Sequence, residues 1–131
     1  MEAATPSELM QQYQLERYMM SLVSEQAAFL RDVARLIDFV NDRGIVATGG
    51  ELMRTQAQQA MYVSAGRSQT MASNHIRKLA IDLNFIKDDR LETDMGVLRP
   101  IGEFWESLHP SNRWGGNFKT LVDTPHFERN V

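Results

Sequence analysis

Three histidines and a set of carboxylates are the side chains of this chain that could carry metal or acid–base chemistry. The chain has no cysteine, which excludes disulfides, thiol catalysis and cysteine-based zinc or iron–sulfur sites. The histidines are His75, His109 and His126, and Asp82 follows the first of them by seven residues. Asp123 precedes His126 by three residues. Two imidazoles and one carboxylate suit Zn²⁺ in an open catalytic site, where water takes the fourth position.

Such a site would suit the hydrolysis of an amide. A bound zinc lowers the pKa of its water to about 7, and Asp123 could act as the general base that takes the water's proton. The same ligand set also suits non-haem iron, and His75 could instead cap or satisfy a loop. Spacing alone leaves these alternatives open.

The hydrophobic pattern predicts the elements that must position these residues. An apolar stripe at three- and four-residue spacing predicts a helix over residues 24–41, and Gly44 supplies its terminator. Apolar residues alternate over 79–86, as in a strand, so Asp82 would point away from the face that carries Ile81 and Leu83. The other expected elements are a strand at 45–48, a helix at about 55–65, a loop at 67–74, a helix at 100–108, a loop at 112–120 and a strand at 126–129.

These helices and strands are interspersed without regular βαβ alternation, which favours an α+β fold. We expect helices packed on a small, mainly antiparallel sheet. Residues 1–20 are expected to be an N-terminal arm that could be helical, and residues 21–131 to be a single domain.

Composition excludes several classes of partner. Fourteen Lys and Arg against 17 Asp and Glu leave a net charge of −3, without a basic run, so a nucleic-acid-binding surface is not expected. No apolar stretch approaches the length of about 20 residues that spans a bilayer, and residues 1–14 lack the pattern of a secretory signal. We therefore expect a monomer that is made in the cytoplasm and does not insert stably into a membrane.

Three segments resemble the zinc D-alanyl-D-alanine carboxypeptidases and dipeptidases and the phage L-alanyl-D-glutamate endopeptidases. Residues 73–82, SNHIRKLAID, resemble the signature S-x-H-x-x-G-x-A-x-D. Residues 114–128 begin with WGG and contain DTPH, like the family's W-G-G loop followed by D/E-x-x-H. Residues 51–59, ELMRTQAQQ, are similar to the Y-R-[ST]…Q-Q segment. The three segments occur in the family's order.

The resemblance implies a role for five residues. His75, Asp82 and His126 would bind zinc, and Asp123 would be the catalytic base. Arg54 would hold the substrate carbonyl and its developing oxyanion, a form of electrostatic stabilisation. The alternative for Arg54 is an ion pair with Glu51, one turn away, which would contribute little.

Neighbouring positions carry weaker expectations. Ser73 and Trp114 are the candidates for substrate binding, although Trp114 could simply anchor its loop. Glu128 could accept the outer N–H of a metal-bound imidazole or be a solvated strand residue. Lys78 stands where the family has glycine, which puts the local backbone geometry in question, and Met53 stands where it has tyrosine, a packing change.

Three further residues are expected to carry no chemistry. His109 matches no ligand position and is interpreted as a surface or helix-end histidine. Met61 and Met71 are expected to fill the core.

The resemblance implies the fold shared by these peptidases and the hedgehog signalling domain. It implies a zinc metallopeptidase of the phage or prophage endolysin type that cleaves the L-Ala–D-Glu bond of peptidoglycan stem peptides. Such an enzyme would act in the periplasm or cell wall and would need a partner pore to reach it. The alternatives are a D-Ala–D-Ala carboxypeptidase and a non-catalytic, zinc-stabilised binding module. The presence of Asp123 favours an enzyme.

Overall fold

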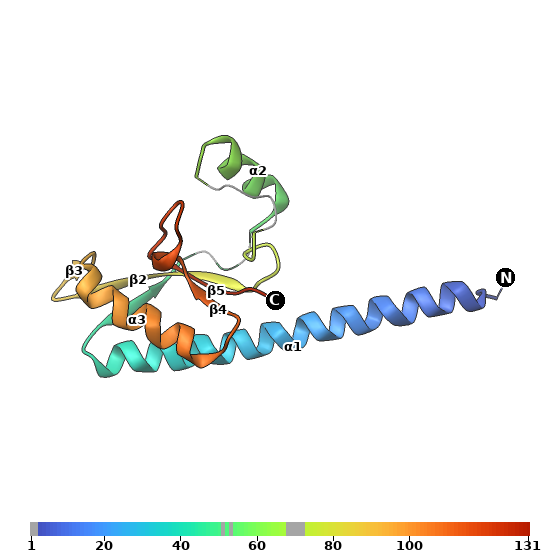
Figure 1. Cartoon of the computed structure of the whole chain (residues 1–131), viewed down its shortest axis with the longest axis horizontal. Helices are drawn as coiled ribbons and strands as arrows, with labels where there is room; N and C mark the ends of the chain where they lie inside the picture. The colour runs from blue at the N-terminus through green and yellow to red at the C-terminus, as the bar shows by residue number, and fades with distance from the viewer. Residues whose placement is uncertain (1–2, 51, 53, 68–72) are drawn as a thin grey trace.

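The computed structural model describes residues 3–50, 52, 54–67 and 73–131. A small antiparallel sheet and the helix α3 (Met95–Leu108) lie against one half of a long helix, α1 (Pro6–Asp42; Figure 1). This arrangement confirms the expected α+β class. Glu51, Met53 and Met71, which were discussed above, lie outside the described residues.

The first helix, α1 (Pro6–Asp42), is much longer than the stretch 24–41 that its apolar stripe predicts. It begins at a capping box in which the side chains and backbone N–H groups of Thr5 and Glu8 bond reciprocally. The N-terminal arm is therefore helical from Pro6 onward, and the helix continues through residue 20 without a break. Although α1 has 37 residues, neither it nor any other helix in the described residues is apolar enough to cross a membrane.

The C-terminal half of α1 supplies one wall of the hydrophobic core. Phe29, Val33, Leu36 and Val40 lie on one helix face and are at most 4% exposed. Phe29 packs edge to face on Trp105 of α3, with ring centroids 5.5 Å apart. These contacts hold α1 against the body of the domain only from its middle onward, and the N-terminal half projects beyond it (Figure 1).

The helix α3 (Met95–Leu108) begins five residues before the expected start at Pro100, which lies inside it. Asp94 causes the earlier start, because its side chain accepts a hydrogen bond from the backbone N–H of Gly96 and so caps the first turn. His109 ends the helix, and its Nδ1 accepts a hydrogen bond from the backbone N–H of Ser111. His109 is thus a helix-end histidine, as expected.

The sheet has the order β1-β2-β5-β4 with antiparallel neighbours, and β3 pairs with β2. Its strands are β1 (Val46–Gly49), β2 (Ala80–Lys87), β3 (Arg90–Leu91), β4 (Asn112–Trp114) and β5 (His126–Arg129). Expected strands at 45–48, 79–86 and 126–129 are confirmed to within one residue at each end. The strand β4 and the following 3₁₀ turn, η1 (Gly115–Asn117), lie where a loop was expected, because three residues are too few for a visible period.

The helix α2 (Gln56–Ser64) confirms the helix expected at about 55–65. It begins at a second capping box, formed by Thr55 and Gln58. The prediction that Met61 fills the core is wrong, since its side chain is 69% exposed. The reason is that α2 lies away from the sheet and α1 (Figure 1), and Gln59 is the one residue of this helix that is buried.

Successive residues of β5 face opposite sides of the sheet. Phe127 packs on Trp105, and Arg129 bonds to Asp32 of α1. His126 and Glu128 bond to each other on the opposite side. One short strand therefore serves both the helix-covered core and an open face.

Candidate metal centre

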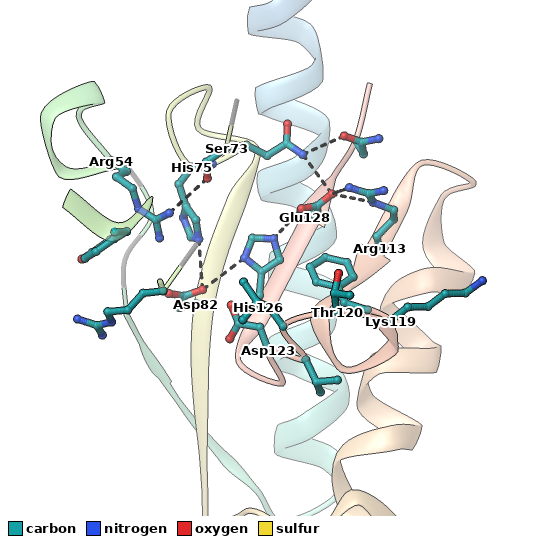
Figure 2. Close-up of a pocket in the computed structure, with 17 residues that line it drawn as sticks. Arg54, Ser73, His75, Asp82, Arg113, Lys119, Thr120, Asp123, His126 and Glu128 are labelled. Carbon is teal, nitrogen blue, oxygen red and sulfur yellow. Dashed lines mark hydrogen bonds and ion pairs between the residues drawn. The ribbon is translucent and has the colours of Figure 1, made fainter. Parts of the chain in front are cut away.

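Three side chains from separate elements converge at the middle of the sheet (Figure 2). His75 comes from the turn before β2, Asp82 from β2 and His126 from β5, and the strand register places Asp82 opposite His126. Oδ1 of Asp82 lies 3.3 Å from Nε2 of His75 and 3.6 Å from Nδ1 of His126. One ligand atom from each residue lies within 4.8 Å of the others. The fold thus brings together the three residues that the sequence suggests as zinc ligands.

The outer nitrogen of each imidazole has a partner that orients the ring. Nδ1 of His75 lies 3.2 Å from the carbonyl oxygen of Leu52, which can only accept. His75 therefore carries its proton on Nδ1 and presents the lone pair of Nε2 to the centre. Nε2 of His126 lies 2.7 Å from Oε1 of Glu128, so in its neutral form this ring presents the lone pair of Nδ1. Such outer partners are typical of metal-binding histidines.

Two polar atoms at the centre remain unsatisfied within the described residues. Nε2 of His75 and Oδ1 of Asp82 are buried without a hydrogen-bond partner in that part of the chain. A buried polar atom without a partner costs about 1–3 kcal/mol. Both are electron-pair donors, so a cation would satisfy them where a further hydrogen-bond acceptor could not. The two nitrogens and one oxygen match the donor set of an open zinc site.

The carboxylates and imidazoles at the centre stabilise one another's charged forms. Burial alone would raise the pKa of Asp82, but the imidazoles of His126 and His75 beside it lower the pKa well below its usual value. Burial alone would lower the pKa of His126, but Asp82 and Glu128 raise it to about 9. A proton on His126 therefore balances the carboxylates when no metal is bound, and a metal must displace it.

Asp123 lies at the mouth of the cleft, on the loop that leads into β5 (Figure 2). Its carbonyl oxygen accepts a hydrogen bond from the backbone N–H of His126, and its own N–H donates to the carbonyl of Gly115. A Cβ on Gly115 would come within 2.0 Å of that Asp123 carbonyl oxygen, so the close approach requires glycine. Partial burial, and next the charge of Asp82, raise the pKa of Asp123.

Trp114 lies in the core and not in the cleft wall, which corrects its assignment as a substrate-binding candidate. Its side chain is 1% exposed, and its Nε1 donates to the carbonyl oxygen of Thr124. The indole packs directly against Gly102 and Gly116, where any Cβ would overlap it. The two glycines of the WGG motif thus leave room for the indole and for the loop that carries Asp123. Trp114 therefore anchors its loop, which was the alternative to substrate binding.

Arg54 lies beside His75 in the cleft (Figure 2) and is held by several groups. Its Nη1 donates to Oε1 of Gln59 at 2.6 Å and to Oγ of Ser73 at 3.4 Å, and its guanidinium stacks 4.5 Å from the ring centroid of Tyr62. Ser73 also accepts a hydrogen bond from the backbone N–H of His75. Ser73 therefore joins Arg54 to the turn that carries His75. The alternative partner, Glu51, lies outside the described residues.

Glu128 bonds to two further residues besides His126. Asn74 and Arg113 both donate to its second oxygen, Oε2. Burial alone would raise the pKa of Glu128, but its interactions with His126, and next with Arg113, lower it. Glu128 is therefore a buried carboxylate that braces an imidazole, and the solvated alternative does not hold. Sequence reasoning missed Asn74 and Arg113. The signals were available, because Asn74 lies within the histidine signature and Arg113 immediately precedes WGG.

The cleft around the centre is largely polar, and its lining carries both basic and acidic side chains. Its basic lining residues are Arg54, Arg67, Arg113 and Lys119. Leu121 and Val122 form an exposed apolar lip beside Asp123. Such a cleft suits a polar substrate.

Comparison with known proteins agrees with this site. Residues 66–129, which include all three converging ligands, match the family described as D-alanyl-D-alanine carboxypeptidase. Over these residues the chain is therefore similar to this family of peptidases.

Two individual proteins are also similar to this chain. The chain is 34% identical over 99 residues to the L-alanyl-D-glutamate peptidase of Listeria phage A118, which covers 73% of this chain and 34% of that protein. This chain thus spans about a third of the length of the phage peptidase. The crystal structure of the Serratia marcescens L-Ala D-Glu endopeptidase ChiX matches with a TM-score of 0.56 and 28% identity, over 66% of this chain and 68% of that chain.

Proposed function

We propose that the chain is a zinc-dependent peptidase that cleaves the L-Ala–D-Glu bond of peptidoglycan stem peptides. The observation that carries the proposal is the convergence of three ligand atoms beside a carboxylate whose pKa is raised. The names of the phage peptidase and of ChiX support the choice of bond. The protein would then act on the cell wall, as the lysis enzyme that the sequence resemblance implies.

The residues that would hold the zinc are His75 through Nε2, Asp82 through a carboxylate oxygen and His126 through Nδ1. Their unsatisfied atoms and the outer partners of both rings support this assignment. Zinc bound there would supply an activated water of pKa about 7 and would polarise the scissile carbonyl.

The chain's own side chains complete the reaction. Asp123 would accept the proton of the attacking water and pass it to the leaving amine, and a raised pKa makes its carboxylate a stronger base. Arg54 would donate hydrogen bonds to the substrate carbonyl, and Ser73 and Gln59 hold its guanidinium toward the cleft. Glu128 would keep His126 in the required orientation.

The test is Asp123→Ala with the digestion of purified peptidoglycan. We expect stoichiometric zinc and a loss of amino-group release by about 100- to 10,000-fold, the usual contribution of a general base. Asp38→Ala, on an exposed face of α1, is the matched control and should keep full activity. Full activity of Asp123→Ala would reject the base assignment.

Mass spectrometry of the released muropeptides separates this proposal from its alternatives. New D-Glu amino termini are expected. Release of free D-Ala would instead identify a D-Ala–D-Ala carboxypeptidase, the activity in the family's description. Stoichiometric zinc without any cleavage by the unaltered protein would identify a zinc-stabilised binding module.

A further inference from the structure

Nine of the fifteen exposed large hydrophobic residues in the described part of the chain lie on α1. Every residue from 3 to 21 is exposed, and this part of the helix projects beyond the body of the domain (Figure 1). The large hydrophobic residues of α1 that are more than half exposed are Leu9, Met10, Tyr13, Leu15, Tyr18, Met19, Met20, Val23 and Leu30. A helical arm without tertiary contacts is marginally stable in water, so this surface calls for a partner.

Five of these residues form a regular line along α1 together with three other exposed residues. Alternate steps of four and three residues link its members, which is the heptad period of a coiled coil. We call this line the outer seam, and its members are Leu9, Tyr13, Glu16, Met20, Val23, Ala27, Leu30 and Ala34. The seam is about 37 Å long at 1.5 Å per residue. It contains one charged residue, Glu16.

The outer seam stays open even where α1 packs on the domain. Phe29 and Val33, which bury against the body, lie on another face of the helix. Val23 and Leu30 are 52% and 58% exposed, and Ala34 is exposed as well. No described part of the chain's own fold therefore covers the seam.

We propose that the outer seams of two copies of this chain pair antiparallel to form a homodimer. A parallel pair in register would place Glu16 against Glu16, and like charges in a coiled-coil core disfavour that arrangement. An antiparallel pair that places Glu16 opposite Ala27 of the second copy avoids this contact. It also brings Arg31, one turn from Ala27, within reach of Glu16 across the interface.

The same register matches the rest of the seam in size. Leu9 lies opposite Ala34, Tyr13 opposite Leu30, and Met20 opposite Val23, so large side chains meet smaller or similar ones. The exposed arm, residues 9–20, then covers residues 23–34 of the second copy, behind the domain. Each arm thus covers the seam that its own chain leaves open.

The dimer leaves both clefts accessible. Phe127 and Arg129 face α1, whereas His126 faces the other side of β5. The proposal does not depend on the peptidase activity. It replaces the monomer that sequence alone led us to expect.

Sedimentation equilibrium tests the oligomeric state. We expect twice the chain mass of 15.0 kDa for the unaltered protein and 15.0 kDa for Met20→Glu, which places a charge in the seam. Leu15→Glu is the matched control: it is equally exposed on the same arm but lies off the seam, and it should remain dimeric. A mass of 15.0 kDa for the unaltered protein, or a dimeric Met20→Glu, would overturn the proposal.

Cysteine cross-linking tests the orientation, since the chain has no cysteine of its own. In the antiparallel pair, Tyr13→Cys of one copy lies opposite Leu30→Cys of the other, whereas two copies of Tyr13→Cys are about 25 Å apart. We expect a covalent dimer, formed with a short thiol-specific cross-linker, when the two variants are mixed and none from either alone. Cross-linking of either variant alone would identify a parallel pair and contradict the proposal. Circular dichroism of each variant monitors the helix, and bound zinc monitors the domain.

Discussion

The two faces of β5 carry two buried polar clusters that differ in one respect. On the face toward α1, Arg129 bonds to Asp32 at 2.6 Å and to Glu25 at 3.2 Å. Asn112 donates to Asp32 and accepts from Arg129. On the other face, Glu128, His126, Asp82 and His75 form the candidate metal centre. Both clusters bury carboxylates against nitrogen donors.

The difference lies in whether the polar atoms find partners. In the Asp32–Arg129 cluster the carboxylate and guanidinium bond within the described structure, and this network ties α1 to β4 and β5. In the metal centre, His75 and Asp82 keep unsatisfied atoms that point at each other. A satisfied cluster stabilises the fold by itself, whereas an unsatisfied one is completed by a ligand. The comparison separates a structural ion pair from a candidate functional site.

The largest effect is expected from Arg129→Met. This change leaves the carboxylate of Asp32, 2% exposed, without its buried cation. Breaking a buried pair in this way costs about 3–5 kcal/mol, which denaturant unfolding would measure. Arg35→Met is the matched control: Arg35 bonds to the same carboxylate at 2.7 Å, but its side chain is 58% exposed, so less than about 1 kcal/mol is expected. Equal losses for the two variants would contradict the assignment of Asp32–Arg129 as the structural cluster.

Zinc removal is expected to have the next largest effect. Zinc at about 100 times its dissociation constant should stabilise the fold by about 2.7 kcal/mol, and a chelator should remove that gain. His126→Ala should bind no zinc, lose activity and show the same melting temperature with and without the chelator. Differential scanning calorimetry and metal analysis check both points. If neither zinc nor the chelator changes the melting temperature of the unaltered protein, the candidate metal centre is a structural polar cluster like that of Asp32 and Arg129.

A smaller effect is expected from Glu128→Gln, which weakens the brace on His126. Loss of such an outer partner typically lowers metal affinity by 10- to 100-fold, or about 1.4–2.7 kcal/mol. Competition with a zinc-binding dye would measure the change. Glu106→Gln is the control, since this partly buried carboxylate bonds to the backbone of Trp114 and does not line the cleft. Unchanged zinc affinity in Glu128→Gln would show that its bond to His126 is not needed for metal binding.

The smallest effect is expected from Lys78→Gly in the turn between His75 and β2. Lys78 has φ of 56°, a left-handed conformation that disfavours side chains. Glycine, the residue at this position in the family signature, should stabilise the fold by about 1 kcal/mol without changing zinc affinity. Asp88→Gly is the control, because Asp88 has φ of 52° but aspartate tolerates this region better. A destabilised Lys78→Gly would mean that the lysine side chain makes a compensating contact.

Features that depend on neighbours in the chain were predicted well. The strand β2 was predictable because its apolar residues alternate, and α2 because a segment rich in Gln, Ala and Met ends at Gly66. The ligand set His75, Asp82 and His126 came from motif resemblance, since spacing alone left iron and loop-capping alternatives open. The capping box at Thr5 is an equally local signal for the start of α1, whereas the apolar stripe alone predicts a shorter helix.

Features that depend on distant residues were predicted poorly. Met61 reads as a core residue and is exposed, because α2 lies away from the sheet. Trp114 reads as a candidate cleft residue and is buried, because Gly102 of α3 makes room for its indole. The bonds of Asn74 and Arg113 to Glu128 join β4, β5 and a turn, and no local pattern reports such a meeting.

The sequence by itself determined which donor atoms the protein possesses and which segments become helices and strands, because propensity, periodicity and capping act over a few residues. Only the tertiary structure decided that these donors meet. The antiparallel register of β2 and β5 places Asp82 opposite His126, although 44 residues separate them in the chain. It also decided which buried carboxylate is satisfied within the fold and which two atoms remain for a cation. Packing in three dimensions decides which polar groups become partners, and the candidate metal centre is a result of that packing.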